Sequence, residues 1–191
     1  MGKTFLIGIC GPSTSGKSTL AKSLGKEFNA VVIEADNFLK SKPKRKVSGY
    51  TSWEHPNNMW MKDFKKSIYN LKKQKETIIP SKKLTDVFDK KINPAKIIIV
   101  EGFLLFYKKS FSKMFDIKIF IDIPFEKIVK RRVDYCGEKE RDYSEKVVIP
   151  EHLKFRKNMI NNSDFVLNGN KTKLQLKKEV IKIIKNKLKW T

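Results

Sequence analysis

The sequence predicts an α/β fold in which helices flank a central parallel sheet. Apolar segments of strand length alternate with segments of helical character along most of the 191 residues. One of them, Ile97–Val100, is apolar throughout, as is expected of a central strand buried on both faces. A glycine-rich turn, Gly11–Ser18, follows the first apolar segment and precedes a helical one. Such sheets bind ligands at the carboxyl ends of their strands, where we therefore expect a site.

The first half of the chain supplies four elements: strand Phe5–Cys10, helix Lys17–Glu27, strand Val31–Glu34 and helix Asn57–Lys72. The last helix is predicted from apolar residues at the spacing of one helix face, namely Met61, Phe64, Ile68 and Leu71. The preceding loop is polar and rich in lysine up to Trp53, and its basic run Lys40–Lys46 is expected to be mobile. No element is predicted for the segment Gln74–Asn93.

The second half supplies the remaining elements: strands Ile97–Val100, Ile117–Ile123 and Phe165–Leu167, and helices Phe125–Asp134, Glu151–Asn161 and Lys173–Leu188. Pro124 suits the entry to the first of these helices, because its fixed φ fits a first helical turn. The charged stretch Gly137–Lys146 has no apolar stripe and is interpreted as part of a lid. We expect residues 1–191 to form one domain with a short lid at about residues 135–147.

The composition limits the possible partners and compartments. The chain carries 42 Lys and Arg against 20 Asp and Glu, a net charge of +22. This charge is compatible with nucleic-acid binding, but the lysines are spread along the chain, which favours a solvated surface that attracts anionic nucleotides. Only Cys10 and Cys136 are present, so the sequence predicts no disulfide framework and a cytoplasmic location. No apolar run reaches the length of a membrane span, and the oligomeric state stays open.

The glycine-rich turn fits the phosphate-binding pattern G-x-x-x-x-G-K-[ST]. Its residues are Gly11, Pro12, Ser13, Thr14, Ser15, Gly16, Lys17 and Ser18, followed by Thr19. Strand, loop and helix in this order are the context that the motif requires, so a chance turn is disfavoured. The backbone N–H groups and the helix N-terminus would surround phosphate oxygens, with Lys17 at the β- and γ-phosphates and Ser18 at Mg²⁺. The sequence therefore predicts a site for a nucleoside triphosphate.

Two acids come at the ends of predicted strands. Asp36 closely follows strand Val31–Glu34, where it could accept a substrate proton or hold Mg²⁺ through water, or merely cap a turn. Glu101 ends the most apolar strand, where it could lie beside Mg²⁺ or be a solvated strand-end acid, and the apolar run favours the first.

Two further pairs are candidates for the site. Arg131 and Arg132, near the end of a helix, either complement its dipole or contact the transferred phosphoryl group. Trp53 and Glu54 could bind a base and a ribose, or simply begin a helix.

With these residues in view, the chain resembles a nicotinamide riboside kinase, within the uridine kinase-like group of P-loop nucleoside kinases. The resemblance covers nearly the whole chain, and the string Glu101–Phe106 is its most specific part. It also rests on Gly11–Thr19, Asp36–Phe38, Ile123–Glu126 with Arg131 and Arg132, and Leu167–Lys171. The resemblance implies a P-loop NTPase fold of the nucleoside kinase type, with ATP and Mg²⁺.

The resemblance also implies roles for particular residues. Asp36 matches the family's catalytic base and a metal-site acid, and Ser18 matches the Mg²⁺ hydroxyl. Trp53 stands at the position of a base-stacking aromatic, and Glu54 at that of the acid that binds the ribose hydroxyls. The remaining matches are Asn37, Phe38, Leu39 and Arg132 for the substrate, with Arg131, Gly169, Asn170 and Lys171 for ATP.

The chain departs from this pattern at three places. Asn37 replaces a second Asp, and Glu54 is longer than the usual Asp. Because the lid is short, the second base-stacking aromatic is not obvious, and Tyr135 is the nearest candidate. The uracil-reading signature of uridine kinases is not recognisable in Ile78–Ile92, which contains no histidine.

These features favour phosphorylation of the 5′-hydroxyl of nicotinamide riboside, with nicotinic acid riboside as a related acceptor. A uridine or cytidine kinase is the alternative. A nucleic-acid 5′-kinase is supported only by the charge. A GTP-binding switch is disfavoured because Asn170-Lys171-Thr172-Lys173 lacks the acid that reads guanine.

Overall fold

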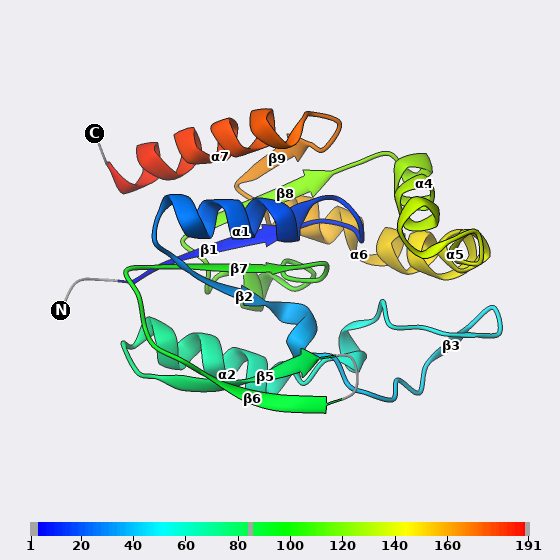
Figure 1. The fold of residues 1–191 in the computed structure, drawn as a ribbon, viewed down its shortest axis with the longest axis horizontal. Coiled ribbons are helices and arrows are strands. Elements are labelled where there is room, and N and C mark those ends of the chain that lie inside the picture. Colours follow the sequence, from blue (N-terminus) through cyan, green and yellow to red (C-terminus); the bar gives the residue numbers. More distant parts are fainter. Residues whose placement is uncertain (1–3, 84–85, 190–191) are drawn as a thin grey trace.

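The computed structural model describes residues 4–83 and 86–189 and has the predicted α/β architecture (Figure 1). Its central sheet has five strands in the order β2-β7-β1-β8-β9, and every neighbouring pair is parallel. Their bounds are β1 Phe5–Cys10, β2 Val31–Glu34, β7 Ile97–Gly102, β8 Ile117–Asp122 and β9 Phe165–Asn168. All five strands were predicted, and their limits differ from the prediction by at most two residues.

Helices cover both faces of this sheet. On one face lie α1 and α7; the other is covered by α2, α3 and α6, while α4 and α5 lie beyond the carboxyl ends of the strands (Figure 1). The helices are α1 Lys17–Glu27, α2 Met61–Lys72, α3 Lys109–Ser112, α4 Phe125–Cys136, α5 Glu140–Tyr143, α6 Ile149–Asn161 and α7 Lys173–Leu188. Within β7, Ile97 and Ile99 belong to one core cluster and Ile98 and Val100 to the other. Both faces of β7 are thus buried, which explains its continuous apolar run.

The strand order fixes the place of the glycine-rich turn. From β1, the chain passes through α1 to β2 on one side of the sheet, whereas β8 pairs with the other side of β1. The loop between β1 and α1 therefore lies at the topological switch point, where parallel sheets leave a crevice outside the ends of their strands. The sequence motif and the topology independently locate the same site.

One helix begins later than predicted. Helix α2 starts at Met61 rather than Asn57, and a 3₁₀ turn over Pro56–Asn58 precedes it. The reason is pairing with the chain before it: Lys40 donates its backbone N–H to the Asn58 carbonyl at 2.7 Å, and Trp60 donates to Phe38 at 2.8 Å. These bonds hold Met59 in an extended conformation between the 3₁₀ turn and α2.

Three segments without predicted elements are ordered in the structure. Within residues 74–93, β5 (Thr77–Lys83) and β6 (Asp86–Ile92) form an antiparallel hairpin beside α2. The lysine-rich loop contains a small hairpin of β3 (Lys46–Val47) and β4 (Tyr50–Thr51). In the predicted lid, α5 continues into a π-helical segment, Ser144–Val148, which leads into α6. In the described part of the chain, no helix is long and apolar enough to cross a membrane.

Helix α2 is held to the sheet by an aromatic cluster. The ring of Phe64 is fully buried, with centroids 4.9 Å from that of Phe38 and 5.3 Å from that of Phe111. We expect Phe64→Ala to lower the free energy of unfolding by about 3–5 kcal/mol, measured by denaturant titration. Tyr69 on the same helix is 57% exposed, so Tyr69→Ala should change it by less than about 0.5 kcal/mol. Equal losses would show that the buried face is assigned wrongly.

Candidate active site

The loop between β1 and α1 has the backbone geometry of a phosphate-binding loop. Gly16 has a left-handed φ of 93° and stands at the N-cap of α1, a conformation that favours glycine. At Gly11 a Cβ atom would lie 2.6 Å from the Ile121 carbonyl oxygen, so only glycine lets the loop approach β8 this closely. The first N–H groups of α1 have no partner within the helix and, with its dipole, favour an anion.

Two polar side chains in this loop, Ser15 and Lys17, are buried and lie in the same cavity wall. Lys17 is buried, and its Nζ donates a hydrogen bond of 3.3 Å to the Pro12 carbonyl. Ser15 Oγ is buried and has no hydrogen-bond partner among the residues that the structure describes. Buried polar atoms are normally paired, so an orphaned hydroxyl beside an ammonium group fits a loop that receives phosphate oxygens.

A cavity of about 790 Å³ opens in front of this loop, and we call it the P-loop cavity. Its volume lies within the range of small-molecule sites. One wall is the loop and the start of α1, and the other includes Arg131, Tyr135, Gly169 and Lys171. Arg131 is fixed there, because its Nη1 donates to the Thr14 carbonyl at 2.9 Å. The cavity thus has the cations Lys17 and Arg131 near the loop, and it extends beyond them to Gly169 and Lys171.

Acids from two strand ends lie near Lys17. Glu101 is only 3% exposed, and its Oε2 has no hydrogen-bond partner within the described residues. Burial raises the pKa of Glu101, Asp36 adds to that effect, and Lys17 and a hydrogen bond from Ser18 oppose it. Asp36, in a 3₁₀ turn over Ala35–Phe38 directly after β2, is exposed. Lys17, Asp36 and Glu101 are therefore close enough to act on one another.

The donor set fits magnesium held mainly by a nucleotide. Among residues 4–83 and 86–189, no three His, Cys, Asp or Glu side chains gather into a site that could hold a metal unaided. Mg²⁺ in phosphoryl-transfer sites is typically held by one or two carboxylates or hydroxyls, substrate phosphates and water. Ser18 and the orphaned oxygen of Glu101 fit that arrangement, with Asp36 nearby.

A second, smaller cavity of about 350 Å³ adjoins the loop through Arg132, and we call it the Trp53 cavity. Its walls are Trp53, Glu54, Arg132, Glu140 and Tyr143. Trp53 and Tyr143 contact each other, since the Trp53 backbone N–H donates to the Tyr143 hydroxyl at 3.4 Å. The cavity therefore has two aromatic residues and two carboxylates around one arginine.

Glu54 has an unusual titration in this cavity. Burial raises its pKa to about 7, with Asp36 and Glu151 acting in the same direction and Arg132 and Lys17 against it. Part of the Glu54 side chain is nevertheless accessible. Near neutral pH this carboxyl can therefore gain or lose a proton, or accept hydrogen bonds from a ligand.

Arg132 links the Trp53 cavity to the phosphate-binding loop. Its Nη1 donates to Ser13 Oγ of the loop at 2.8 Å, and its Nη2 donates to Glu140 at 2.7 Å. The guanidinium carbon lies 5.4 Å from the centroid of the Tyr143 ring, and Nε is buried without a partner in the described part of the chain. A planar cation with one unused donor, beside the phosphate-binding loop, is suited to contact a phosphate group.

The structure places some of the expected substrate residues elsewhere. Phe38 is fully buried in the core against Phe64, and the partly buried Leu39 packs beside the same core, so neither lines the Trp53 cavity. Tyr135 is 88% exposed and lines the P-loop cavity instead of facing Trp53. Asn170 lines a neighbouring cavity with Asp122, whereas Gly169 and Lys171 line the P-loop cavity. Asn37 is half-buried beside Asp36.

The sequence did not reveal Tyr143 and Glu140 as cavity residues. Both belong to the charged segment that was interpreted as a lid. The available signal was an aromatic in a segment otherwise made of charged and small residues, but the opposite wall, Trp53, lies 90 residues earlier in the chain. Only the tertiary fold brings the two together.

A phosphate-binding loop at the switch point of a five-stranded parallel sheet defines the P-loop kinase fold. A solved kinase structure from Silicibacter sp. has this fold, with a TM-score of 0.67 and 18% identity over 87% of this chain and 91% of its own. Shikimate kinase from Aquifex aeolicus has a TM-score of 0.53 and 18% identity, over 95% and 98%. The model of the Phosphoribulokinase / Uridine kinase family matches residues 6–166, and the chain belongs to this family.

Two kinds of relative within the family are similar to the chain to the same degree. Nicotinamide riboside kinase 1 of Homo sapiens is 31% identical over 173 residues, which are 82% of this chain and 79% of the relative. Uridine kinase of Clostridium tetani is 30% identical over 173 residues, 80% and 81% of the two chains. Sequence similarity alone therefore does not separate the two acceptors.

The roles of Lys17 and Ser18 can be separated by metal titration. We expect Lys17→Ala and Ser18→Ala each to lower kcat/KM for ATP by about 10²–10³, the usual loss for a phosphate- or charge-stabilising contact. Because Ser18 would act through the metal, raised Mg²⁺ should partly restore only the Ser18 variant. Steady-state kinetics over a Mg²⁺ series measures this. Equal rescue of both variants, or of neither, would contradict the assignment.

The raised pKa of Glu54 predicts a pH-dependent stability. The folded protein holds the Glu54 proton more tightly than the unfolded chain, whose Glu titrates near about 4.3. The stability due to this proton is full below that value and is lost as pH rises through about 7. We expect the free energy of unfolding of wild type, relative to Glu54→Gln, to fall between about pH 5 and pH 8. A constant difference would show that Glu54 titrates normally.

Proposed function

We propose that this protein transfers the γ-phosphoryl group of ATP to the 5′-hydroxyl of nicotinamide riboside, and also of nicotinic acid riboside. The product is the mononucleotide, which feeds NAD synthesis. The observation that carries the proposal is the Trp53 cavity: two aromatic residues and an acid, joined to a phosphate-binding loop by Arg132. Such a cavity suits a planar ring with an attached ribose, at a position from which the ribose can reach the loop.

On the donor side, the loop residues bind and orient the triphosphate. The N–H groups of α1 and the Lys17 ammonium would donate hydrogen bonds to the phosphate oxygens, and Arg131 holds the loop from the other wall. Ser18 and Glu101 would hold Mg²⁺, which when bound neutralises charge on the β- and γ-phosphates. Gly169 and Lys171 would border the adenine at the far end of the P-loop cavity.

On the acceptor side, Trp53 would stack on the base and Glu54 would accept hydrogen bonds from the ribose hydroxyls. Asp36 takes the proton of the 5′-hydroxyl as the oxygen forms its bond to the γ-phosphorus and the bond to the bridging oxygen of ADP breaks. Arg132 stabilises the charge of the phosphoryl group in passage. Positioning and electrostatics carry most of the rate, since the protein forms no covalent intermediate.

The similarity to uridine kinases favours a second candidate acceptor, a pyrimidine riboside. The same cavity could stack a uracil or cytosine ring and bind the same ribose hydroxyls. The absence of histidine from Ile78–Ile92 argues against it, because the uracil-reading signature is missing from this segment.

A nucleoside panel tests the proposal. The protein is incubated with Mg-ATP and nicotinamide riboside, nicotinic acid riboside, uridine, cytidine or adenosine, and the phosphorylated products are identified by mass. We expect the pyridine ribosides to give the highest kcat/KM. Asp36→Asn serves as the control, since loss of a positioned base should lower kcat by about 10²–10⁴ while ATP still binds. A preference for uridine would refute the nicotinamide assignment. An active Asp36→Asn variant would refute the role of Asp36 as the general base.

Kinetics can distinguish the two candidates for the second base-stacking aromatic, Tyr143 and Tyr135. Trp53→Ala and Tyr143→Ala should each raise KM for the nucleoside about ten- to hundredfold, the cost of losing about 1–3 kcal/mol of stacking. KM for ATP should change little in both. Tyr135→Ala should instead raise KM for ATP and leave KM for the nucleoside nearly unchanged, because Tyr135 lines the P-loop cavity. If Tyr135→Ala alone weakens the acceptor, the base lies on the other side of the loop.

A further inference from the structure

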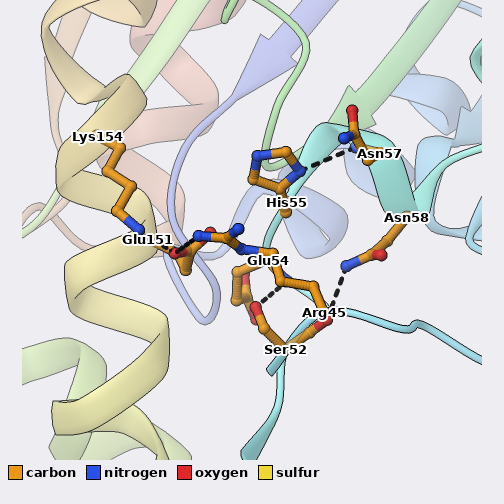
Figure 2. A network of polar contacts seen from close by, with 8 residues as sticks. All are labelled: Arg45, Ser52, Glu54, His55, Asn57, Asn58, Glu151 and Lys154. Atoms are coloured by element: carbon orange, nitrogen blue, oxygen red, sulfur yellow. Dashed lines mark hydrogen bonds and ion pairs between the residues drawn. The ribbon is translucent and has the colours of Figure 1, made fainter. Parts of the chain in front are cut away.

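The lysine-rich loop between β2 and α2 is tied to helix α6 by an ion pair that crosses the fold (Figure 2). Arg45 donates from Nε and Nη2 to the two carboxylate oxygens of Glu151, at 3.2 Å and 3.0 Å. Lys154, one turn along α6, also contacts Glu151. A bidentate pair of this kind fixes direction as well as distance. The basic run that was expected to be mobile is therefore anchored at one end.

Burial is unequal within this pair. The side chain of Glu151 is 0% exposed, whereas that of Arg45 is 39% exposed. A fully buried carboxylate needs its partners, because an unpaired buried charge is strongly unfavourable. Arg45, in contrast, can turn into solvent. The buried Glu151 therefore fixes the position of Arg45, and Arg45 in turn fixes the loop.

Backbone contacts pass this constraint on to the Trp53 cavity. Ser52 donates its backbone N–H to the Arg45 carbonyl at 2.9 Å, and Glu54 donates its own to Ser52 Oγ at 3.3 Å. Asn58 also contacts Ser52, because its Nδ2 donates a hydrogen bond of 2.7 Å to the Ser52 carbonyl (Figure 2). The residues between Arg45 and Glu54 thus form a unit, which we call the acceptor loop. Its far end supplies Trp53 and Glu54 to the cavity.

We propose that Glu151 is a positioning residue which, through Arg45, holds the acceptor loop so that Trp53 and Glu54 face the bound nucleoside. The proposal rests on the proposed function, because it assigns the Trp53 cavity to the acceptor. It identifies a residue of α6, outside that cavity, as a determinant of acceptor affinity. Neither the loop motif nor the strand-end acids indicate such a role for Glu151.

The test uses the isosteric variant Glu151→Gln, which removes the charge and keeps the volume. We expect KM for the nucleoside to rise at least about fivefold, while kcat and KM for ATP stay within about twofold, because a charged hydrogen bond is lost outside the reacting centre. Hydrogen exchange should show the amide of Ser52 losing protection in the same variant. Lys154→Gln is the matched control, since Lys154 contacts Glu151 but not the loop, and it should change none of these quantities.

A double-mutant cycle shows whether the effect passes through Arg45. If it does, Arg45→Met together with Glu151→Gln should raise KM for the nucleoside no further than Glu151→Gln alone. Additive effects would overturn the proposal. A lower melting temperature with unchanged nucleoside KM would overturn it too, and would leave Glu151 a purely structural role. Trp53→Ala separates failure of the Glu151 proposal from failure of the proposed function. If this variant also leaves nucleoside KM unchanged, the acceptor does not bind in the Trp53 cavity.

Discussion

The site is organised around one buried cation, the ammonium group of Lys17. It acts electrostatically on residues from four separate parts of the fold: Cys10 on β1, Glu54 in the acceptor loop, Glu101 on β7 and His152 on α6. A buried lysine is tolerable only where carbonyls and carboxylates surround it. The Pro12 carbonyl and the strand-end acids supply that environment, and they converge because their strands are parallel and end at one edge.

The charges of the groups around Lys17 suit the binding of an anion. Burial lowers the pKa of His152 to about 4 and raises that of Cys10 to about 11, so both are neutral at physiological pH. Burial also raises the pKa of Glu54 and of Glu101, an effect that Lys17 opposes at both carboxyls. With Arg131 and Arg132 on the facing helix, the charge balance near the loop favours a polyphosphate. This local balance does not depend on the large net charge of the surface.

The sequence was most informative where chemistry is local. The loop from Gly11 to Ser18 and the strands around it were predictable, because a contiguous motif and a continuous apolar run are each compatible with few local structures. The predicted start of α2 was four residues too early. Hydrogen bonds between residues 38–40 and 58–60 prevent residues 57–60 from joining the helix.

The acceptor side was harder to predict, because it depends on contacts between distant segments. The sequence singled out Trp53 and Glu54 as acceptor candidates, which stays a prediction, whereas Tyr143 and Glu140 approach them only through the fold. The Arg45–Glu151 pair joins residues 106 positions apart, and neither carries a recognisable motif. Phe38 was predicted to contact the substrate, but its ring is fully buried in the core against Phe64.

The proposed function requires that the nucleoside bind in the Trp53 cavity with its 5′-hydroxyl directed toward Asp36. A crystal structure with nicotinamide riboside and a non-hydrolysable ATP analogue measures this directly. We predict the pyridine ring against Trp53 and Tyr143, the ribose hydroxyls at Glu54, and the 5′-oxygen about 2.6–3.2 Å from an Asp36 oxygen. A nucleoside bound beside Tyr135 in the P-loop cavity, or a 5′-oxygen beyond reach of Asp36, would contradict the claim.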